Sequence, residues 1–405
     1  MPTPEPRDPS RVARQAQMRD QNLGVALRGI VDAPEPVSRA QLAASEGLAR
    51  ATVSGLVDHL IEARLVRELD PAQTQRAGRP AVPLAPARGT VAGVGMEVNV
   101  DYLGVRVIDL AGDVLAEHVE LDDLRGADAA TVLDRLAALV APVVDGLRAG
   151  GVRLAGTTLA LPGLVDRVTG PLRVAPNLGW RDVDVVGALS GPAAPTVLSA
   201  LPPRVGNEAN LAARAEAHAR RGSPSFAYVS GEVGIGGAIV LDGDIFPGRH
   251  GWSGEIGHIV VDAFRGPHPA DGSLEALAGQ DAMLRAAGLP ATARLDALLD
   301  ALRAGDARAE AAVAQAARAL GVALANVANV VDVGEVVLGG TFGQLFGHVH
   351  DEVAARLQEL VIFSPWSPLL VSPARAGQYP AMTGGALAAL SRVLTDPAEW
   401  LRTQA

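Results

Sequence analysis

Three short polar segments in the second half of the chain hold side chains suited to binding hydroxyl groups. Asn207 and Glu208 form the first segment, Glu255 and His258 the second, and Glu275 the third. A carboxylate accepts hydrogen bonds from two neighbouring hydroxyls, an amide donates and accepts, and an imidazole adds direction. Each residue also has an ordinary structural interpretation, since Asn207 can cap a helix and Glu255 and His258 can lie in a solvated turn. Whether they meet in one site depends on the elements that position them.

Hydrophobic patterning around these segments indicates alternating strands and helices. Three strand-like runs are followed by a helix with one apolar stripe and a buried strand, and a similar order recurs after Phe226. The strand-like runs are Val91–Val98, Tyr102–Asp109, Val114–Val119, Leu154–Leu161, Phe226–Val233, Ile235–Leu241 and Glu335–Leu338, with helices near 132–147 and across 274–331. The pattern predicts an α/β body over 87–405, made of two ribonuclease H-like lobes (87–205 and 206–405). We expect a small ligand to bind in the cleft between them.

Residues 15–86, ahead of this body, show the pattern of a winged helix-turn-helix. A first helix is expected over 15–31, and a second begins after Ser38, whose spacing from Gln41 is that of a capping box. Gly47 suits a tight turn with positive φ, and a third helix runs from about Ala49 to Ala63. This third helix buries Val53, Leu56, Val57, Leu60 and Ile61 at helical spacing. Residues 1–14 are interpreted as a disordered tail.

The polar face of the third helix is suited to reading DNA. In helix-turn-helix motifs the start of the second helix of the pair enters the major groove, where arginine pairs with guanine. An arginine at a wing tip can enter a narrow minor groove or hold a phosphate. The candidate DNA contacts are Ser38, Arg39, Arg50, Thr52, Ser54 and His59, with Arg76 and Arg79 in the expected wing. The alternative is a small helical module that binds another protein.

The distribution of charge is consistent with an N-terminal part that binds DNA and a body that does not. All 35 basic residues are arginines; residues 1–90 carry a net charge of +2 and the remainder −12. An acidic body repels DNA phosphates, so the N-terminal part is expected to make any nucleic-acid contact. The chain has no cysteine, which excludes disulfides and thiolate chemistry. We found no apolar run near the roughly 20 residues that span a bilayer and no signal peptide, so a cytoplasmic protein without membrane partners is expected.

From about residue 15 to 395 the chain resembles the ROK family (repressor, open reading frame, kinase), and within it the winged-helix transcriptional repressors of the xylose and N-acetylglucosamine type. Several motifs carry the resemblance together, although each alone is weak. They are Leu161-Pro162-Gly163, Pro176-Asn177-Leu178-Gly179-Trp180, Gly206-Asn207-Glu208-Ala209-Asn210, Gly234-Ile235-Gly236-Gly237, Gly254-Glu255-Ile256-Gly257-His258 and Val337-Leu338-Gly339-Gly340.

The resemblance implies a body of the actin-like ATPase and sugar-kinase type, and a monosaccharide site within it. Asn207, Glu255, His258 and Glu275 match residues that hydrogen-bond ring hydroxyls in related sugar kinases. Asn177 and Glu208 belong to the matched motifs and complete the expected site, and Gly163 would let the backbone approach the ligand.

Departures from the kinase members of the family are equally informative. The position of the first phosphate loop holds Gly95 followed by Glu97-Val98-Asn99, and that of the second holds Glu232-Val233-Gly234. Carboxylates therefore occupy positions where kinases of the family bind phosphates. The position of the catalytic Asp holds Glu208, whose longer side chain shifts the carboxylate. The segment 265–273 lacks the thiols that hold zinc in relatives. We therefore expect no catalytic residues, no cofactor and no structural zinc.

Two functions from different classes remain open. The first is a sugar-responsive transcription factor, most simply a repressor, that binds a palindromic operator as a homodimer or a dimer of dimers. The second is an ATP-dependent sugar kinase with a fused DNA-binding domain, for which Gly234-Ile235-Gly236 and Gly339-Gly340 are retained.

Overall fold

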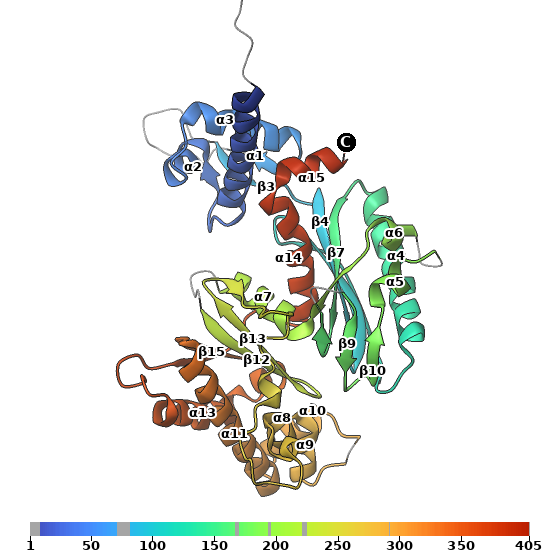
Figure 1. Cartoon of the computed structure of the whole chain (residues 1–405), viewed down its shortest axis with the longest axis vertical. Helices are drawn as coiled ribbons and strands as arrows, with labels where there is room; N and C mark the ends of the chain where they lie inside the picture. The colour runs from blue at the N-terminus through green and yellow to red at the C-terminus, as the bar shows by residue number, and fades with distance from the viewer. Residues whose placement is uncertain are drawn as a thin grey trace, which may run out of the picture.

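The computed structural model describes residues 9–70, 82–166, 170–192, 196–220, 225–290 and 292–404 of the protein. A small N-terminal unit of helices and a three-stranded sheet precedes two α/β lobes that each hold a five-stranded sheet (Figure 1). The α/β class predicted for the body is therefore confirmed. The segment 1–14, interpreted as a disordered tail, lies partly outside the described residues. Its described end is helical, because α1 begins at Pro9 and not at residue 15.

The N-terminal unit packs three helices around a small antiparallel sheet with strand order β1-β3-β2. Its elements are α1 (Pro9–Val31), β1 (Val37–Ser38), α2 (Arg39–Ser45), α3 (Arg50–Glu62), β2 (Val66–Glu68) and β3 (Pro83–Pro86). The predicted capping box is present: Ser38 Oγ accepts from the Gln41 backbone N–H, and Gln41 Oε1 accepts from the Ser38 backbone N–H. Gly47 has a φ of +64°, as predicted for the turn before α3. All the apolar residues predicted on the inner face of α3 are buried except Ile61, which is half-buried.

The first lobe is built on a mixed sheet with strand order β11-β7-β4-β5-β6. Its strands are β4 (Val91–Val98), β5 (Tyr102–Asp109), β6 (Val114–Leu121), β7 (Arg153–Leu161) and β11 (Arg204–Asn207), with helices α4 (Ala129–Ala149), α5 (Val185–Ser190) and α6 (Thr196–Ala200). The sequence did not predict a second, small sheet of β8 (Leu164–Val165), β9 (Leu172–Ala175) and β10 (Trp180–Val183). Strand β11 runs parallel to β7 and leads directly into the next helix, so Asn207 lies at the edge of the sheet that faces the second lobe.

The second lobe has strand order β14-β13-β12-β15-β16. Its elements are α7 (Glu208–Ala219), β12 (Phe226–Gly231), β13 (Ile235–Leu241), β14 (Asp244–Ile245), the 3-10 turns η1 (Ile256–His258) and η2 (Pro269–Gly272), α8 (Leu274–Ala278), α9 (Gln280–Ala286), α10 (Leu295–Arg303), α11 (Ala307–Val331), β15 (Glu335–Gly339), α12 (Gly340–Gln344), α13 (Phe346–Leu360) and β16 (Leu370–Pro373). The sequence predicted β12, β13 and β15 but neither β14 nor β16.

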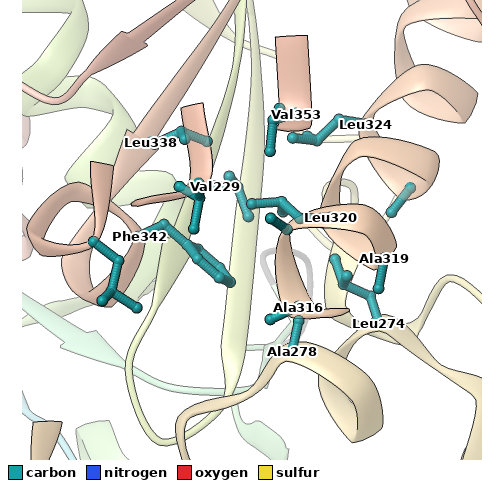
Figure 2. Packing of buried hydrophobic residues seen from close by; sticks show 14 of the residues in the cluster. Val229, Leu274, Ala278, Ala316, Ala319, Leu320, Leu324, Leu338, Phe342 and Val353 are labelled. Carbon is teal, nitrogen blue, oxygen red and sulfur yellow. The ribbon is translucent and has the colours of Figure 1, made fainter. Parts of the chain in front are cut away.

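Helix α11 forms the centre of the second lobe's core. Its Leu320 and Leu324 are fully buried; Leu320 lies toward Val229 of β12, and Leu324 lies beside Val353 of α13 (Figure 2). Because alanines line much of the same helix, the neighbouring helices α8 and α13 approach it closely. Among the described residues α11 alone is long and apolar enough to cross a membrane by length and composition, but 61% of its most apolar window is buried inside the protein. Core packing accounts for its composition.

The last two helices leave the second lobe and return to the first. Helix α14 (Pro380–Thr395) packs on β4, β5 and β7, and α15 (Pro397–Gln404) lies against α1 (Figure 1). The approach of α14 is close, since a Cβ at Gly95 would lie 1.8 Å from the Met382 carbonyl oxygen. Residues 380–404, predicted as part of the second lobe, thus pack on the first lobe and the N-terminal unit as well as on α7 of the second lobe.

Candidate functional site

All seven residues predicted to bind a sugar line one pocket between the two lobes. The pocket contains Gly163, Asn177, Asn207, Glu208, Glu255, His258 and Glu275, together with Pro162, Pro176 and residues 234–237. They lie on segments far apart in the sequence, so the fold is what brings them together. The pocket is a product of the lobe arrangement and of the N-terminus of α7.

On the first-lobe side, the structural role and the proposed binding role of Asn207 coexist. Asn207 caps α7, because its Oδ1 accepts from the Asn210 backbone N–H at 3.0 Å. Its Nδ2 donates to the Gly163 carbonyl at 3.0 Å, which leaves one N–H and one oxygen lone pair for a ligand. Gly163 has a φ of +90°, and a Cβ there would lie 2.1 Å from the Val174 carbonyl oxygen. The chain's own packing on β9 therefore requires this glycine, irrespective of any ligand.

On the second-lobe side, the carboxylates are held against the backbone of β13. Glu275, at the start of α8, accepts from the Ile235 backbone N–H at 2.8 Å through Oε2. Gly234 lies between Glu275 and Asn177, since a Cβ on it would be within 2.7 Å of both side chains. Burial raises the pKa of Glu255. The charge interaction with His258 lowers this pKa, and the charge of Glu275 raises it further. The ligand-facing surface is therefore rich in hydrogen-bond acceptors.

A second group of carboxylates lies directly behind the pocket. Glu97, Glu208 and Glu232 surround Asn99, whose Nδ2 is 3.2 Å from Glu97 Oε1, 3.2 Å from Glu208 Oε2 and 2.5 Å from Glu232 Oε2. We call these four residues the carboxylate cluster. Glu208 connects the two sites, because it lines both the pocket between the lobes and a smaller cavity shared with Glu97 and Glu232. Glu97 Oε2 is buried and has no hydrogen-bond partner.

Protonation relieves the repulsion inside this cluster. Burial raises the pKa of Glu97 to about 7. Burial, followed by the charge of Glu97, raises the pKa of Glu232 to about 8. The pKa of Glu208 lies well above its usual range because of burial and then the charge of Glu232. One amide cannot satisfy three ionised carboxylates, so shared protons are the physical consequence.

Within the described residues, no three His, Asp or Glu side chains are grouped in a way that could hold a metal ion. His268 is used locally, since its Nδ1 accepts from the Ala270 backbone N–H at the start of η2.

The predicted DNA-contacting residues divide into three groups. Arg50 and Thr52 are exposed at the start of α3, and Ser54 and His59 are half-buried on the same helix. Ser38 and Arg39 already have partners within the N-terminal unit, and their DNA contact stays a prediction. Ser38 is 7% exposed with its hydroxyl used in the capping box, and Arg39 pairs with Asp58 and Glu68, which ties α2 to α3 and β2. Arg76 and Arg79 lie outside the described residues.

A comparison with protein families matches residues 93–392 to the ROK family. The chain belongs to this family. Among curated ROK relatives, the xylose repressor of Bacillus subtilis (strain 168) is 27% identical over 279 residues, covering 68% of this chain and 70% of that protein. The DNA-binding transcriptional dual regulator NagC of Escherichia coli (strain K12) is 28% identical over 331 residues, covering 78% and 79%.

Solved ROK structures share the fold. A ROK family transcriptional regulator, described as a homologue of the E. coli MLC protein, superposes with a TM-score of 0.76 at 25% identity and covers 95% of this chain and 98% of that one. A ROK hexokinase from Thermus thermophilus superposes with a TM-score of 0.60 at 28% identity, covering 75% and 99%. The regulator thus covers more of this chain than the hexokinase does.

Two features of the site were missed by sequence reasoning. Glu97, Asn99 and Glu232 were noted as departures from a phosphate loop, but not as one cluster with Glu208. The spacing of 97 and 99 on a strand places both side chains on one face and was the available signal. Trp252 was not noted at all; its Nε1 donates to the Val165 carbonyl at 3.1 Å and so links the two lobes beside the pocket.

Proposed function

We propose that this ROK protein is a sugar-responsive transcriptional repressor that leaves its operator when a monosaccharide fills the pocket between the lobes. The observation that carries the proposal is the gathering of seven hydrogen-bonding or ligand-approaching residues in one pocket of a chain that also has a helical N-terminal unit. Relatives named as the xylose repressor and the N-acetylglucosamine repressor support the same function.

A continuous packed route connects the pocket with the N-terminal unit. Helix α7 starts at Asn207 and Glu208 and packs along α14. The far end of α14 shares a core with the N-terminal unit, in which Leu390 and Val393 pack with Leu27 and Leu60. A change in lobe closure that shifts α7 would therefore reach the DNA-binding unit through rigid helices. For true allosteric coupling, the sugar must bind the free and the DNA-bound states with different affinity.

We propose that the N-terminal unit is a winged helix-turn-helix in which α3 enters the major groove. Its three helices and its β1-β3-β2 sheet have the order expected for that motif. Arg50 is the main candidate for base readout, because it is exposed at the start of α3 and makes no ion pair within the described part of the chain. Thr52, Ser54 and His59 would add contacts to bases or phosphates.

Replacing Arg50 with alanine is expected to weaken operator binding by about 1–3 kcal/mol, since a bidentate contact to guanine would be lost. Fluorescence anisotropy with a DNA site that the protein selects from a random pool measures this. In the same assay, adding the effector sugar to wild-type protein should weaken binding about 5- to 150-fold. Arg148→Ala, an exposed arginine on α4 of the body, is the matched control and should bind as wild type does. DNA binding that ignores every sugar, or no DNA binding at all, would overturn the proposed function.

We further propose that two chains associate through an apolar surface of the second lobe. Val330 at the end of α11 is 85% exposed, and Ile362 and Trp366 beyond α13 are 79% and 83% exposed. Asn329 joins these segments, because its side chain bonds to the backbone of both Leu360 and Ile362. The surface continues into a groove lined by Ile256 and Ile259, beside the sugar-pocket residue Glu255. A contiguous exposed apolar surface of this kind is typical of a protein interface.

Val330→Glu is expected to convert the dimer to a monomer, because it would bury a charge at the centre of the proposed interface. Size-exclusion chromatography with light scattering distinguishes the 41.5 kDa monomer from a species of twice that mass. Leu121→Glu changes another exposed apolar residue, on the edge strand β6, and serves as the control. A Val330→Glu protein that stays dimeric would place the interface elsewhere.

We propose that the protein does not act as a kinase. The carboxylate cluster holds Glu97 and Glu232 in the place that the family's kinase pattern gives to phosphate loops, and no cation balances them within the cluster. Sugar-dependent ATP turnover that is lost in Glu208→Gln would contradict this proposal.

A further inference from the structure

We infer that the pocket accepts an unphosphorylated sugar and rejects its phosphate esters, an inference that rests on the sugar-sensing function proposed above. The carboxylates of Glu208, Glu255 and Glu275 line the pocket, and none of the described residues around it is an arginine. Hydroxyl groups are hydrogen-bond donors that suit these acceptors, whereas a phosphate is an acceptor that brings negative charge.

Proteins hold a phosphate with arginine or lysine, with free backbone N–H groups, or at a helix N-terminus. A helix N-terminus and the backbone N–H groups of a glycine-rich turn are present here, but side chains of the protein already bind to both. At the start of α7, Asn207 Oδ1 accepts a hydrogen bond from the Asn210 backbone N–H. Glu208, the first residue of that helix, places a carboxylate at its positive end. In the glycine-rich turn, the Glu275 carboxylate accepts a hydrogen bond from the Ile235 backbone N–H at 2.8 Å. An incoming phosphate would have to displace the Asn207 amide oxygen from the first and the Glu275 carboxylate from the second.

The carboxylate cluster increases the expected discrimination against phosphate esters. Glu97 and Glu232 lie behind Glu208 and are joined to it through Asn99 Nδ2. When these groups are ionised they repel a phosphate through a poorly solvated region, and when they are protonated they still supply no cation. Neither Glu97 nor Glu232 lines the sugar pocket, so both influence specificity without touching the sugar.

The test is calorimetric titration of the full chain at pH 8.5 with matched pairs of ligands. The pairs are glucose and glucose 6-phosphate, N-acetylglucosamine and its 6-phosphate, and xylose and xylose 5-phosphate. We expect one free sugar to bind and its ester to bind at least about 100-fold more weakly. An ester that binds as tightly as its free sugar, or more tightly, overturns this inference and leaves sugar sensing intact. Silence from all six ligands overturns the sensing function itself.

A double variant, Glu97→Gln with Glu232→Gln, tests the cluster separately. Affinity for the free sugar should stay within about threefold, because neither residue lines the pocket, while the preference over the ester should narrow by about fivefold or more. Glu310→Gln, an exposed glutamate on α11, should leave the preference unchanged. An unchanged preference in the double variant would remove Glu97 and Glu232 from the discrimination.

Discussion

Alanine in place of Glu255 will leave operator binding intact and abolish its release by sugar. Glu255 lies on the turn before η1, lines the pocket with His258 and Glu275, and makes no side-chain capping bond within the described part of the chain. Because the structure records no hydrogen bond of this carboxylate within the described residues, only its charge interaction with His258, its removal is expected to act on the ligand and to spare the fold. Loss of one charge-assisted hydrogen bond costs about 1.5–3 kcal/mol, so sugar affinity should fall roughly 10- to 100-fold or more.

Two titrations check this result: calorimetry with the sugar, and anisotropy of the operator complex with and without it. Glu255→Gln keeps one acceptor oxygen and should give an intermediate sugar affinity. Glu310→Ala, on the exposed face of α11, controls for the loss of a glutamate elsewhere. If Glu255→Ala binds sugar as wild type does, the pocket is not the sugar site and the effector acts at another place.

The features that the sequence predicted share a local physical cause. The Ser38 capping box and the Gly47 turn each depend on residues a few positions apart, so their signals survive without knowledge of the fold. The sugar-pocket residues are different, because Asn207 and Glu275 are far apart in the chain and their meeting could only be inferred from family resemblance.

Long-range contacts explain what the sequence did not reveal. Arg39 was predicted to contact DNA from its position alone. The sequence did not show that Asp58 and Glu68, which are distant in sequence, form ion pairs with its guanidinium. Nothing in the helical period of 380–395 shows that α14 returns to the first lobe, although the glycines at 93 and 95 on β4 are the surface that admits it. The carboxylate cluster was hidden for the same reason, since β4, α7 and the turn after β12 contribute one glutamate each.

The carboxylate cluster should make the protein more stable at pH 6 than at pH 8.5. In the folded chain the pKa of Glu97 is about 7 and that of Glu232 about 8, against 4.5 for an ordinary glutamate. Between pH 4.5 and 8 the folded state therefore holds protons that the unfolded chain has released, so the free energy of unfolding falls as pH rises. At about 1.4 kcal/mol per pKa unit, the loss from pH 6 to pH 8.5 is roughly 1–4 kcal/mol.

Thermal unfolding of wild type and of the Glu97→Gln, Glu232→Gln double variant across this range measures the effect. Glutamine imitates the protonated carboxyl, so the variant should lose most of the slope and be the more stable protein at pH 8.5. The charges of Glu97 and Glu232 also raise the pKa of Tyr102 and of Glu208, two residues that the variant retains. The variant retains every titrating group outside the cluster. The difference between the two pH profiles therefore belongs to the cluster, directly to Glu97 and Glu232 and indirectly to Glu208, whose pKa falls when their charges are removed. Parallel profiles would mean that these carboxyls are ionised in the folded protein, and the repulsion behind the sugar pocket would then be permanent.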